Sequence, residues 1–393
     1  MDFTVSPRIE DFRNRITRFV DERVLPLEAD PASYDEHENI RIELADELRA
    51  QARAEGLWCL QLKPETGGQG LGRMGMAVCY EAMNRSIFGP VAFNSAAPDD
   101  GNMMVLEMAA TPAQKERWLA PIVDGSVRSA FVMTEPHPGS GSDPSMMLTT
   151  ATRKGDRYVI RGRKWFITGA GEAQHFILMA RTSDDPRKGL TAFLFDRDQP
   201  GWRIDRRIPI MGPEEHGGHC ELEFDGLEIP VENVLLEEGR GMKVTQIRLA
   251  PARLTHCMRW LGGATRAQEI AIAYARERRA FGKPIGEHEG VGFMLADNEI
   301  EIQQARLMIW HTAWLLDQGE HARHESSMSK VAVSEALFRI VDRCVQVLGG
   351  RGMSRDTVVE QLFREIRGFR IYDGPSEVHR WAIAKRLMRA NRK

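Results

Sequence analysis

The sequence has little of what a secreted or membrane-embedded protein needs. Its five cysteines are scattered, odd in number and never spaced as C-x-x-C, which argues against a disulfide framework or a zinc site and fits a reducing compartment. No apolar run approaches the ~20 residues that span a bilayer. The first residues show no charged segment followed by the apolar run of a signal peptide. We therefore expect a cytoplasmic protein with no membrane span and no metal site.

The sequence also lacks a strong excess of charge of either sign. The 393 residues carry a formal net charge of −3 at pH 7, with 28% charged and 42% hydrophobic residues. A nearly balanced charge gives no electrostatic basis for binding nucleic acid or an anionic membrane. The composition is that of a globular protein with a sizeable core, and the length suggests roughly two to three domains.

The first part of the chain has a helical pattern. Apolar residues recur at intervals of three and four, as at Ile9, Phe12, Ile16 and Phe19. The stretch Thr111-Pro112-Ala113-Gln114 predicts a helix start, because Thr can cap, Pro suits the first position and Gln can complete a capping box. We expect an N-terminal helical domain over residues 1–128.

The pattern changes to short β-forming runs between residues 129 and 240. Runs separated by turn signals, without helices between them, predict a compact and mainly antiparallel β domain. The sequence shows neither βαβ alternation nor a G-x-G-x-x-G motif after a strand, which argues against a Rossmann fold. Turns are expected at Gly155-Asp156, Gly162 and Asp225-Gly226. The runs are Arg157–Arg161, Lys164–Thr168, Phe176–Arg181, Leu190–Phe195, Trp202–Arg206 and Glu221–Phe224.

Helical periodicity returns after residue 241 and lasts to the C-terminus. The longest segments cover about Met242–Arg279, Gly286–Asp317 and Ser327–Leu348, which exceeds the usual helix length. Such lengths suit a bundle or an interface between subunits. The fold class we predict is a multidomain α+β protein: an N-terminal helical domain, a central β domain (129–240) and a C-terminal four-helix-type bundle (241–393).

Three polar clusters interrupt these scaffolds, and each has an ordinary explanation beside a chemical one. Phe131–Asp143 is rich in small and hydroxyl residues, which could cradle a phosphate or form a surface loop. In Lys164–Gly169, Phe166 stands two positions from Thr168, so both would face one side of a strand; they could cover a flat ring or simply pack the sheet. The helix ends at Arg278–Lys283 and Gln346–Gly352 could hold a pyrophosphate or be C-caps.

A sharp turn near the C-terminus carries a carboxylate. One helical pattern ends at Phe369 and another begins at Trp381, and Gly374-Pro375 between them favours a tight turn. Asp373 therefore stands between two helices. Taken alone, Asp373 could cap the following helix, as Asp often does, or it could be a catalytic base aimed into a cleft.

In their order along the chain, these pieces resemble the motifs of the acyl-CoA dehydrogenase family, and the resemblance spans nearly the whole sequence. The matches are Phe131–Asp143 with the T-E-P-…-G-S-D flavin loop, Lys164–Thr168 with K-x-x-I-T, Glu228–Leu235 with V-P-x-x-N-x-L, Arg278–Gly282 with R-x-x-F-G, Gln346–Gly352 with Q-x-x-G-G-x-G, and Arg370–Arg380 with the I-Y-E-G-T segment that carries the base.

The resemblance implies FAD as the cofactor and a role for each matched residue. Residues along the flavin would be Phe131, Met133 and Thr134, with Ser140 near the pyrophosphate or the acyl thioester, Phe166 over one flavin face and Thr168 close to N5. Residues that hold the adenosine and pyrophosphate end of an FAD bound mainly by a neighbouring subunit would be Arg278, Phe281, Gln346, Gly349 and Gly350, with Glu377 also near the FAD. Arg253 would lie close to the CoA chain.

The resemblance also implies a reaction and partners. Asp373 would remove the α-proton of an acyl-CoA while a hydride passes from the β-carbon to flavin N5, giving the 2-enoyl-CoA. The turn at Gly374 would hydrogen-bond the thioester carbonyl and stabilise the developing enolate. Electrons would pass to an electron-transfer flavoprotein. Shared FAD sites imply a homo-oligomer, a dimer or a tetramer, in fatty acid metabolism.

Two departures from the family pattern keep other functions open. Asp373 stands where most members have Glu, and Pro375 replaces the usual Thr. The segment Asp-Gly-Pro-x-Glu-Val-His resembles a branch in which some members act on 4-hydroxyacyl-CoA or 4-phosphoacyl-CoA. A flavin oxidase of the same fold, for example on nitroalkanes, is a second hypothesis. A flavin-free helical scaffold or binding protein is a third.

Overall fold

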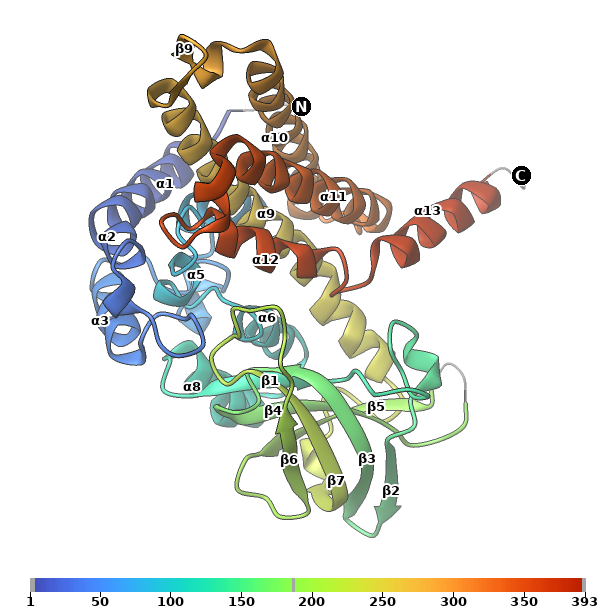
Figure 1. The fold of residues 1–393 in the computed structure, drawn as a ribbon. Helices are drawn as coiled ribbons and strands as arrows, with labels where there is room; N and C mark the ends of the chain where they lie inside the picture. Colours follow the sequence, from blue (N-terminus) through green and yellow to red (C-terminus); the bar gives the residue numbers. More distant parts are fainter. Residues whose placement is uncertain (1–3, 186–187, 391–393) are drawn as a thin grey trace.

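The computed structural model describes residues 4–185 and 188–390, with the helices on one side of a β domain (Figure 1). The predicted face of the first helix is confirmed, since Phe12, Ile16 and Phe19 are buried. The predicted capping box is also confirmed, because Thr111 and Gln114 each bond the other's backbone N–H. The N-terminal helices are α1 (Pro7–Phe19), α2 (Leu25–Glu28), α3 (Ile42–Ala54), α4 (Gly72–Met83), α5 (Gly89–Ala92), α6 (Asp99–Ala109), α7 (Pro112–Gln114) and α8 (Ala120–Val123).

The central part forms a seven-stranded sheet in the order β1-β4-β2-β3-β7-β6, with β5 paired to β4. Strand β1 runs parallel to β4, and β2 meets β4 in parallel at one residue pair. The remaining pairs are antiparallel, so the prediction of a mainly antiparallel domain is confirmed. The strands are β1 (Arg128–Val132), β2 (Thr150–Lys154), β3 (Arg157–Thr168), β4 (Ala173–Arg181), β5 (Leu190–Asp196), β6 (Trp202–Arg207) and β7 (His219–Pro230).

Two of the predicted turns are wrong. Gly162 lies inside β3, which joins two predicted runs into one strand; a Cβ at Gly162 would lie 2.6 Å from Thr149 Oγ1, so a close approach and not a turn requires this glycine. Asp225-Gly226 lies inside β7 at a shift of register. Strand β2 was not predicted, because four of its five residues are exposed and it has no apolar alternation.

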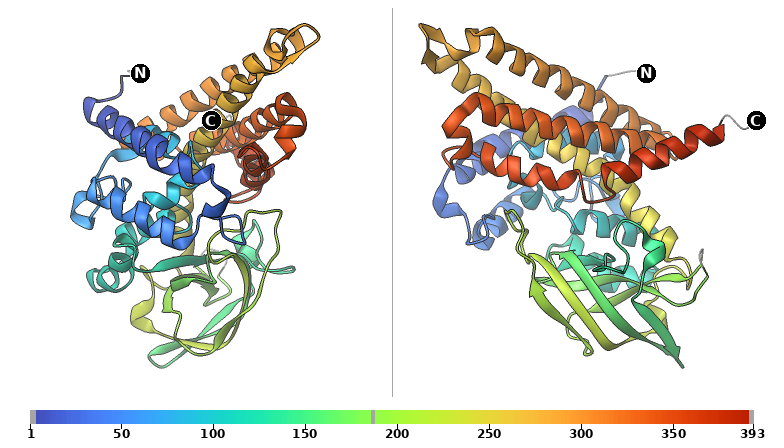
Figure 2. Two further views of the ribbon diagram at one scale, coloured as in Figure 1. Left: turned by 60° about the vertical axis from the view of Figure 1, so that its left-hand side comes forward. Right: turned by 45° about the vertical axis from the view of Figure 1, so that its right-hand side comes forward.

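The long C-terminal helices are confirmed with ends shifted by a few residues. They are α9 (Gly241–Glu277), α10 (Glu289–Asp317) and α11 (Arg323–Leu348), followed by α12 (Val359–Phe369) and α13 (Ser376–Ala390). A small hairpin of β8 (Arg279–Ala280) and β9 (Lys283–Pro284) connects α9 to α10. Figure 2 shows the three long helices side by side and α13 extending away from the body. Within the described ranges, no helix combines the length and apolar character that crossing a membrane requires.

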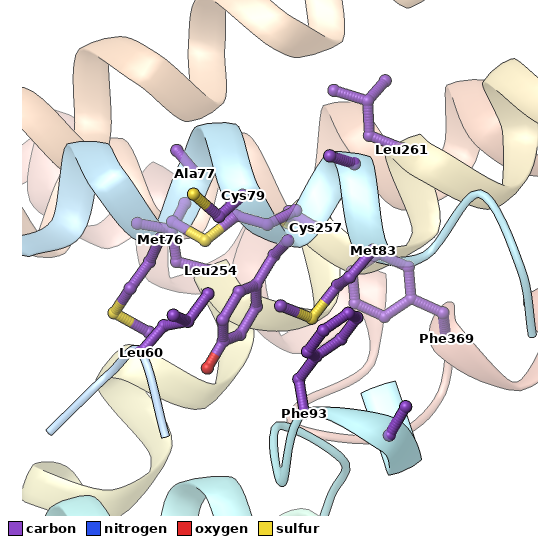
Figure 3. Packing of buried hydrophobic residues seen from close by; sticks show 14 of the residues in the cluster. Leu60, Met76, Ala77, Cys79, Met83, Phe93, Leu254, Cys257, Leu261 and Phe369 are labelled. Carbon is purple, nitrogen blue, oxygen red and sulfur yellow. The ribbon is translucent and has the colours of Figure 1, made fainter. Parts of the chain in front are cut away.

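Two hydrophobic cores support these parts. The sheet has its own core, whereas the N-terminal helices share a single core with the C-terminal bundle. In that shared core (Figure 3), side chains of α4 and α9 pack together: Met76, Cys79 and Met83 against Leu254, Cys257 and Leu261. The domain boundaries at 128/129 and 240/241 stay a prediction.

A close approach of α4 and α9 depends on a glycine. A Cβ at Gly262 would lie 2.2 Å from the Glu81 carbonyl oxygen, whereas a Cβ at Gly263 would meet only side chains, the nearest at 3.1 Å. We expect Gly262→Ala to lower the free energy of unfolding by about 1–3 kcal/mol, because the helices must separate. Gly263→Ala is the matched control and should change stability by under about 1 kcal/mol. Thermal unfolding midpoints test this, and equal midpoints would contradict the close approach.

Candidate active site

The turn between α12 and α13 holds Asp373 in a conformation that is uncommon for a residue with a side chain, with φ +54°. Two side chains donate to its carbonyl oxygen: Arg253 Nε at 3.0 Å and His379 Nε2 at 3.2 Å. Lys330 Nζ donates to the next carbonyl, that of Gly374, at 3.3 Å. A Cβ on Gly374 would lie 2.6 Å from the His379 ring, so this position requires glycine.

Two of the groups that hold this turn, His379 and Lys330, are buried, and burial changes their pKa values. Burial lowers the pKa of His379 to about 4, so its ring is neutral at pH 7 and donates through Nε2–H. Burial also lowers the pKa of Lys330, which donates to the Phe369 carbonyl at 2.6 Å and lies 4.5 Å from the Phe369 ring centre. The turn is therefore fixed by side chains from three helices.

The Asp373 carboxylate is 14% exposed and faces two basic side chains of α9. His256 Nε2 lies 3.3 Å from Asp373 Oδ2, and an Arg248 nitrogen lies 4.0 Å from Oδ1. The Arg248 guanidinium also lies 4.9 Å from the centre of the Phe131 ring on β1 and donates to Asn102. Burial lowers the pKa of Arg248, and the Asp373 carboxylate opposes that shift. Arg248 thus connects the carboxylate to the edge of the β domain.

A buried ion pair organises the loop after β1. Lys164 and Glu135 are 2.9 Å apart, with side chains 0% and 2% exposed. Glu135 also accepts from the backbone N–H groups of Ser140, Leu148 and Thr149 at 3.1, 2.7 and 2.8 Å. Burial alone would raise the pKa of Glu135, but the Lys164 ammonium and these donors outweigh it and hold the carboxyl below its usual range. The pair keeps the loop folded against β3.

The predicted flavin residues of the β domain gather at this loop and the end of β3. Phe166 is 45% exposed and has φ +51° at a bulge, so the regular alternation assumed for Phe166 and Thr168 does not hold there. Thr168 Oγ1 lies 3.0 Å from His219 Nδ1, and the Trp165 N–H donates to the Thr134 carbonyl. Within the described part of the chain, no group hydrogen-bonds the buried Ser140 hydroxyl. Met133 packs against the core shared by the helices, and its carbonyl accepts from Lys164 Nζ at 2.9 Å.

The remaining predicted residues are exposed and lie in two places, at the ends of α9 and α11 and on α13. Phe281 is 97% exposed in the hairpin after α9, and Arg351 lies over the ring of Tyr274, so the ends of α9 and α11 are neighbours. Glu377 lies on α13 and its side chain is 80% exposed. The exposed residues at the ends of α9 and α11 are Arg278, Phe281, Gln346, Gly349 and Gly350.

Four residues around the carboxylate were not predicted: Arg248, His256, Arg259 and Lys330. Arg248, His256 and Arg259 fall on one side of α9, because spacings of eight and three residues keep them within a narrow sector of a helix. Helix α9 carries other polar residues as well, so nothing in the sequence singled out these three. Arg259 pairs with the buried Asp100 at 2.7 Å.

Comparison with known proteins identifies the family. Three family models match in sequence: acyl-CoA dehydrogenase N-terminal domain (6–126), middle domain (130–227) and C-terminal domain (239–388). The protein named "Probable acyl-CoA dehydrogenase FadE2" of Mycobacterium tuberculosis is 39% identical, over 98% of this chain and 96% of that protein. The chain belongs to the acyl-CoA dehydrogenase family. It is an oxidoreductase of that family.

Two further similar proteins are informative. Acyl-CoA dehydrogenase family member 11 of Homo sapiens is 36% identical over 95% of this chain, which spans 50% of that protein's length. The solved FAD complex of PigA has a TM-score of 0.89 and 26% identity, covering 99% of both chains. The fold predicted from the sequence is therefore confirmed, whereas the site residues stay a prediction.

The Glu135–Lys164 pair gives a stability test. Glu135→Gln keeps the size of the side chain but leaves Lys164 buried without its carboxylate, so we expect a loss of about 3–5 kcal/mol. Adding Lys164→Met removes the uncompensated charge and should restore part of that loss. Thermal unfolding and proteolysis of the 133–149 loop measure both variants. Independent, additive effects would contradict the pairing.

Proposed function

We propose that this protein catalyses the FAD-dependent α,β-dehydrogenation of an acyl-CoA thioester. The observation that carries this proposal is the buried Asp373 carboxylate. It stands on a turn held by α9, α11 and α13, and it is linked through Arg248 to the β-domain edge where Phe131 lies. A base fixed in this way, beside the edge of the β domain, suits proton removal from a bound substrate.

The residues of the β domain fit FAD. The buried, unsatisfied Ser140 hydroxyl has a hydrogen bond to give, and the half-exposed Phe166 ring can cover a flat cofactor. Bound FAD would supply the acceptor for the hydride that leaves the β-carbon. The FAD complex of PigA supports this assignment. The residues proposed to lie along the flavin are Phe131, Met133, Thr134, Ser140, Phe166 and Thr168.

The chain's own groups would carry the proton chemistry. Asp373 removes the α-proton, and the Gly374 N–H donates to the thioester carbonyl, where negative charge develops. Asp is shorter than the usual Glu by one methylene, and a misplacement of about 1 Å can cost ~100-fold in rate. The placement of an Asp carboxylate would therefore depend more strongly than that of a Glu on the cations that donate to the carbonyls of this turn. Arg253 donates to the Asp373 carbonyl, and in this proposal it also lies close to the CoA chain.

The exposed group at the ends of α9 and α11 supports a site shared between subunits. We propose that Arg278, Phe281, Gln346, Gly349 and Gly350 hold part of an FAD that is bound mainly by a neighbouring copy, with Glu377 near it. The 97% exposure of the Phe281 ring favours a contact outside its own chain. We propose that the protein forms a homo-oligomer, either a dimer or a tetramer. An electron-transfer flavoprotein would accept the electrons, and the reaction would belong to fatty acid metabolism.

A second candidate is an enzyme for acyl chains with a 4-hydroxy or 4-phospho group. Arg259 is neutralised by Asp100 at 2.7 Å, whereas among the residues that the structure describes no carboxylate comes closer to Arg248 than Asp373 at 4.0 Å. A buried guanidinium without a close counter-ion favours a polar group on the substrate.

Anaerobic flavin bleaching tests the reaction and the base. Wild-type protein should be bleached by at least one member of a panel of straight, branched, aromatic and 4-hydroxylated acyl-CoAs. Asp373→Asn should keep bound FAD and bleach ~100- to 10,000-fold more slowly, whereas Asp373→Glu keeps a carboxylate and should retain more activity than Asn. Normal bleaching of Asp373→Asn would remove Asp373 from the mechanism. Rapid turnover with O₂ alone would favour the oxidase hypothesis.

The second candidate has its own measurement. In Arg248→Met the selectivity for 4-substituted over unsubstituted acyl-CoAs, expressed as the ratio of kcat/KM values, should fall ~10- to 100-fold, because a charge-assisted hydrogen bond is lost. Arg278→Met is the control, since it should not alter this ratio. An unchanged ratio in Arg248→Met would exclude the 4-substituted substrate class.

A further inference from the structure

His256 is the group that most directly faces the carboxylate of Asp373. Its Nε2 lies 3.3 Å from Asp373 Oδ2, and its ring lies 4.8 Å from the Tyr372 ring and 5.9 Å from that of Phe369. Oδ2 is buried, and among the described residues it accepts no hydrogen bond of good geometry. Catalytic hydrogen bonds are often long in a site without substrate and shorten when the substrate binds.

The partner on the other side of the ring determines where the His256 proton lies. An Arg259 nitrogen lies 3.3 Å from His256 Nδ1. A guanidinium can only donate, so Nδ1 must accept. In a neutral imidazole the proton is then on Nε2, the nitrogen that faces Asp373. Arg259 is itself fixed, because it donates to Asp100 and to the Ser95 carbonyl, each at 2.7 Å.

The ring is neutral because of its surroundings. Burial holds the pKa of His256 well below its usual value, and Arg259, Arg248 and Lys330 lower it further. His256 cannot act as the base, since Nδ1 is engaged and Nε2 already carries a proton. The groups that face the turn from the other helices are Lys330 of α11 and His379 of α13.

We propose that His256 is a positioning residue, whose Nε2–H holds Oδ2 of Asp373 and leaves Oδ1 to take the proton. This inference rests on the proposed function. As the α-carbon–hydrogen bond breaks, its proton forms a bond to Oδ1 and its electron pair forms the α,β double bond. The β-carbon–hydrogen bond breaks at the same time and releases a hydride, which bound FAD would accept. His256 keeps its own proton throughout. A short carboxylate on a tight turn has few other ways to be oriented, and its orientation decides the rate.

Substituting His256 with glutamine or with asparagine separates the functions of its two ring nitrogens. The amide nitrogen of Gln reaches about as far as Nε2 of His, so His256→Gln can still donate to Asp373. The amide oxygen of Asn lies about where Nδ1 does, so His256→Asn can accept from Arg259 but cannot reach the carboxylate. Any effect from loss of the ring, its stacking or its volume should appear in both variants.

The test is anaerobic stopped-flow reduction with whichever acyl-CoA bleaches the wild-type holoenzyme. We expect the limiting reduction rate of His256→Asn to fall ~30- to 100-fold, with the dissociation constants of the acyl-CoA and of its 2-enoyl-CoA product changed less than about threefold. The isotope effect of α-deuterated substrate should rise in this variant, because proton removal becomes slower. His256→Gln should recover most of the rate.

The outcomes separate this inference from the function on which it rests. If no acyl-CoA bleaches the wild-type protein, the proposed function fails and the role of His256 fails with it. If the wild type is bleached, equal rates for His256→Asn and His256→Gln would overturn the positioning role alone. So would a loss confined to ligand affinity or to FAD content, since that would show a structural role.

Discussion

The active site depends on three side chains that donate to the backbone carbonyls of one turn. Arg253, Lys330 and His379 come from three different helices and meet at the backbone of Asp373 and Gly374. A residue with a side chain holds a left-handed conformation only when its surroundings determine it. The base is therefore positioned by the packing of the whole bundle.

The same convergence concentrates positive charge around a single carboxylate. Arg248 and Lys330 are buried near Asp373, while the neighbouring imidazoles of His256 and His379 are neutral because of burial. Such a field would stabilise an enolate as it forms, because fixed cations in a poorly solvated site need no reorganisation. Asp373 would thus accept the proton, and the cations would stabilise the negative charge that remains on the substrate.

Much of the fold could be predicted from the sequence because it depends on local pattern. The long helices and most strands follow from apolar periodicity. Strand β2 could not be predicted, because its residues face solvent and only pairing with β3 reveals it. Gly162 was predicted to be a turn. The close approach of Thr149, which requires a glycine there, arises only when the chain folds and cannot be seen in the sequence.

The site was predictable to a similar, partial extent. Gly374-Pro375 predicts a turn, so the position of Asp373 between two helices could be predicted from the sequence. Arg248, His256 and Lys330 could not, since each alone is an ordinary polar residue on a helix. They become a group only when α9 and α11 pack against the turn.

The glycine that lets α4 approach α9 has a consequence for how the protein tolerates change. Gly262 and His256 are six residues apart on one helix, about 9 Å along its axis. A helix is stiff over that length, so displacing it at Gly262 would shift the imidazole relative to the turn by a comparable amount. A single substitution at this structural contact, far from the carboxylate, would then change both the stability of the protein and its catalytic rate. Natural selection on catalysis would therefore also act on the packing of α4 against α9.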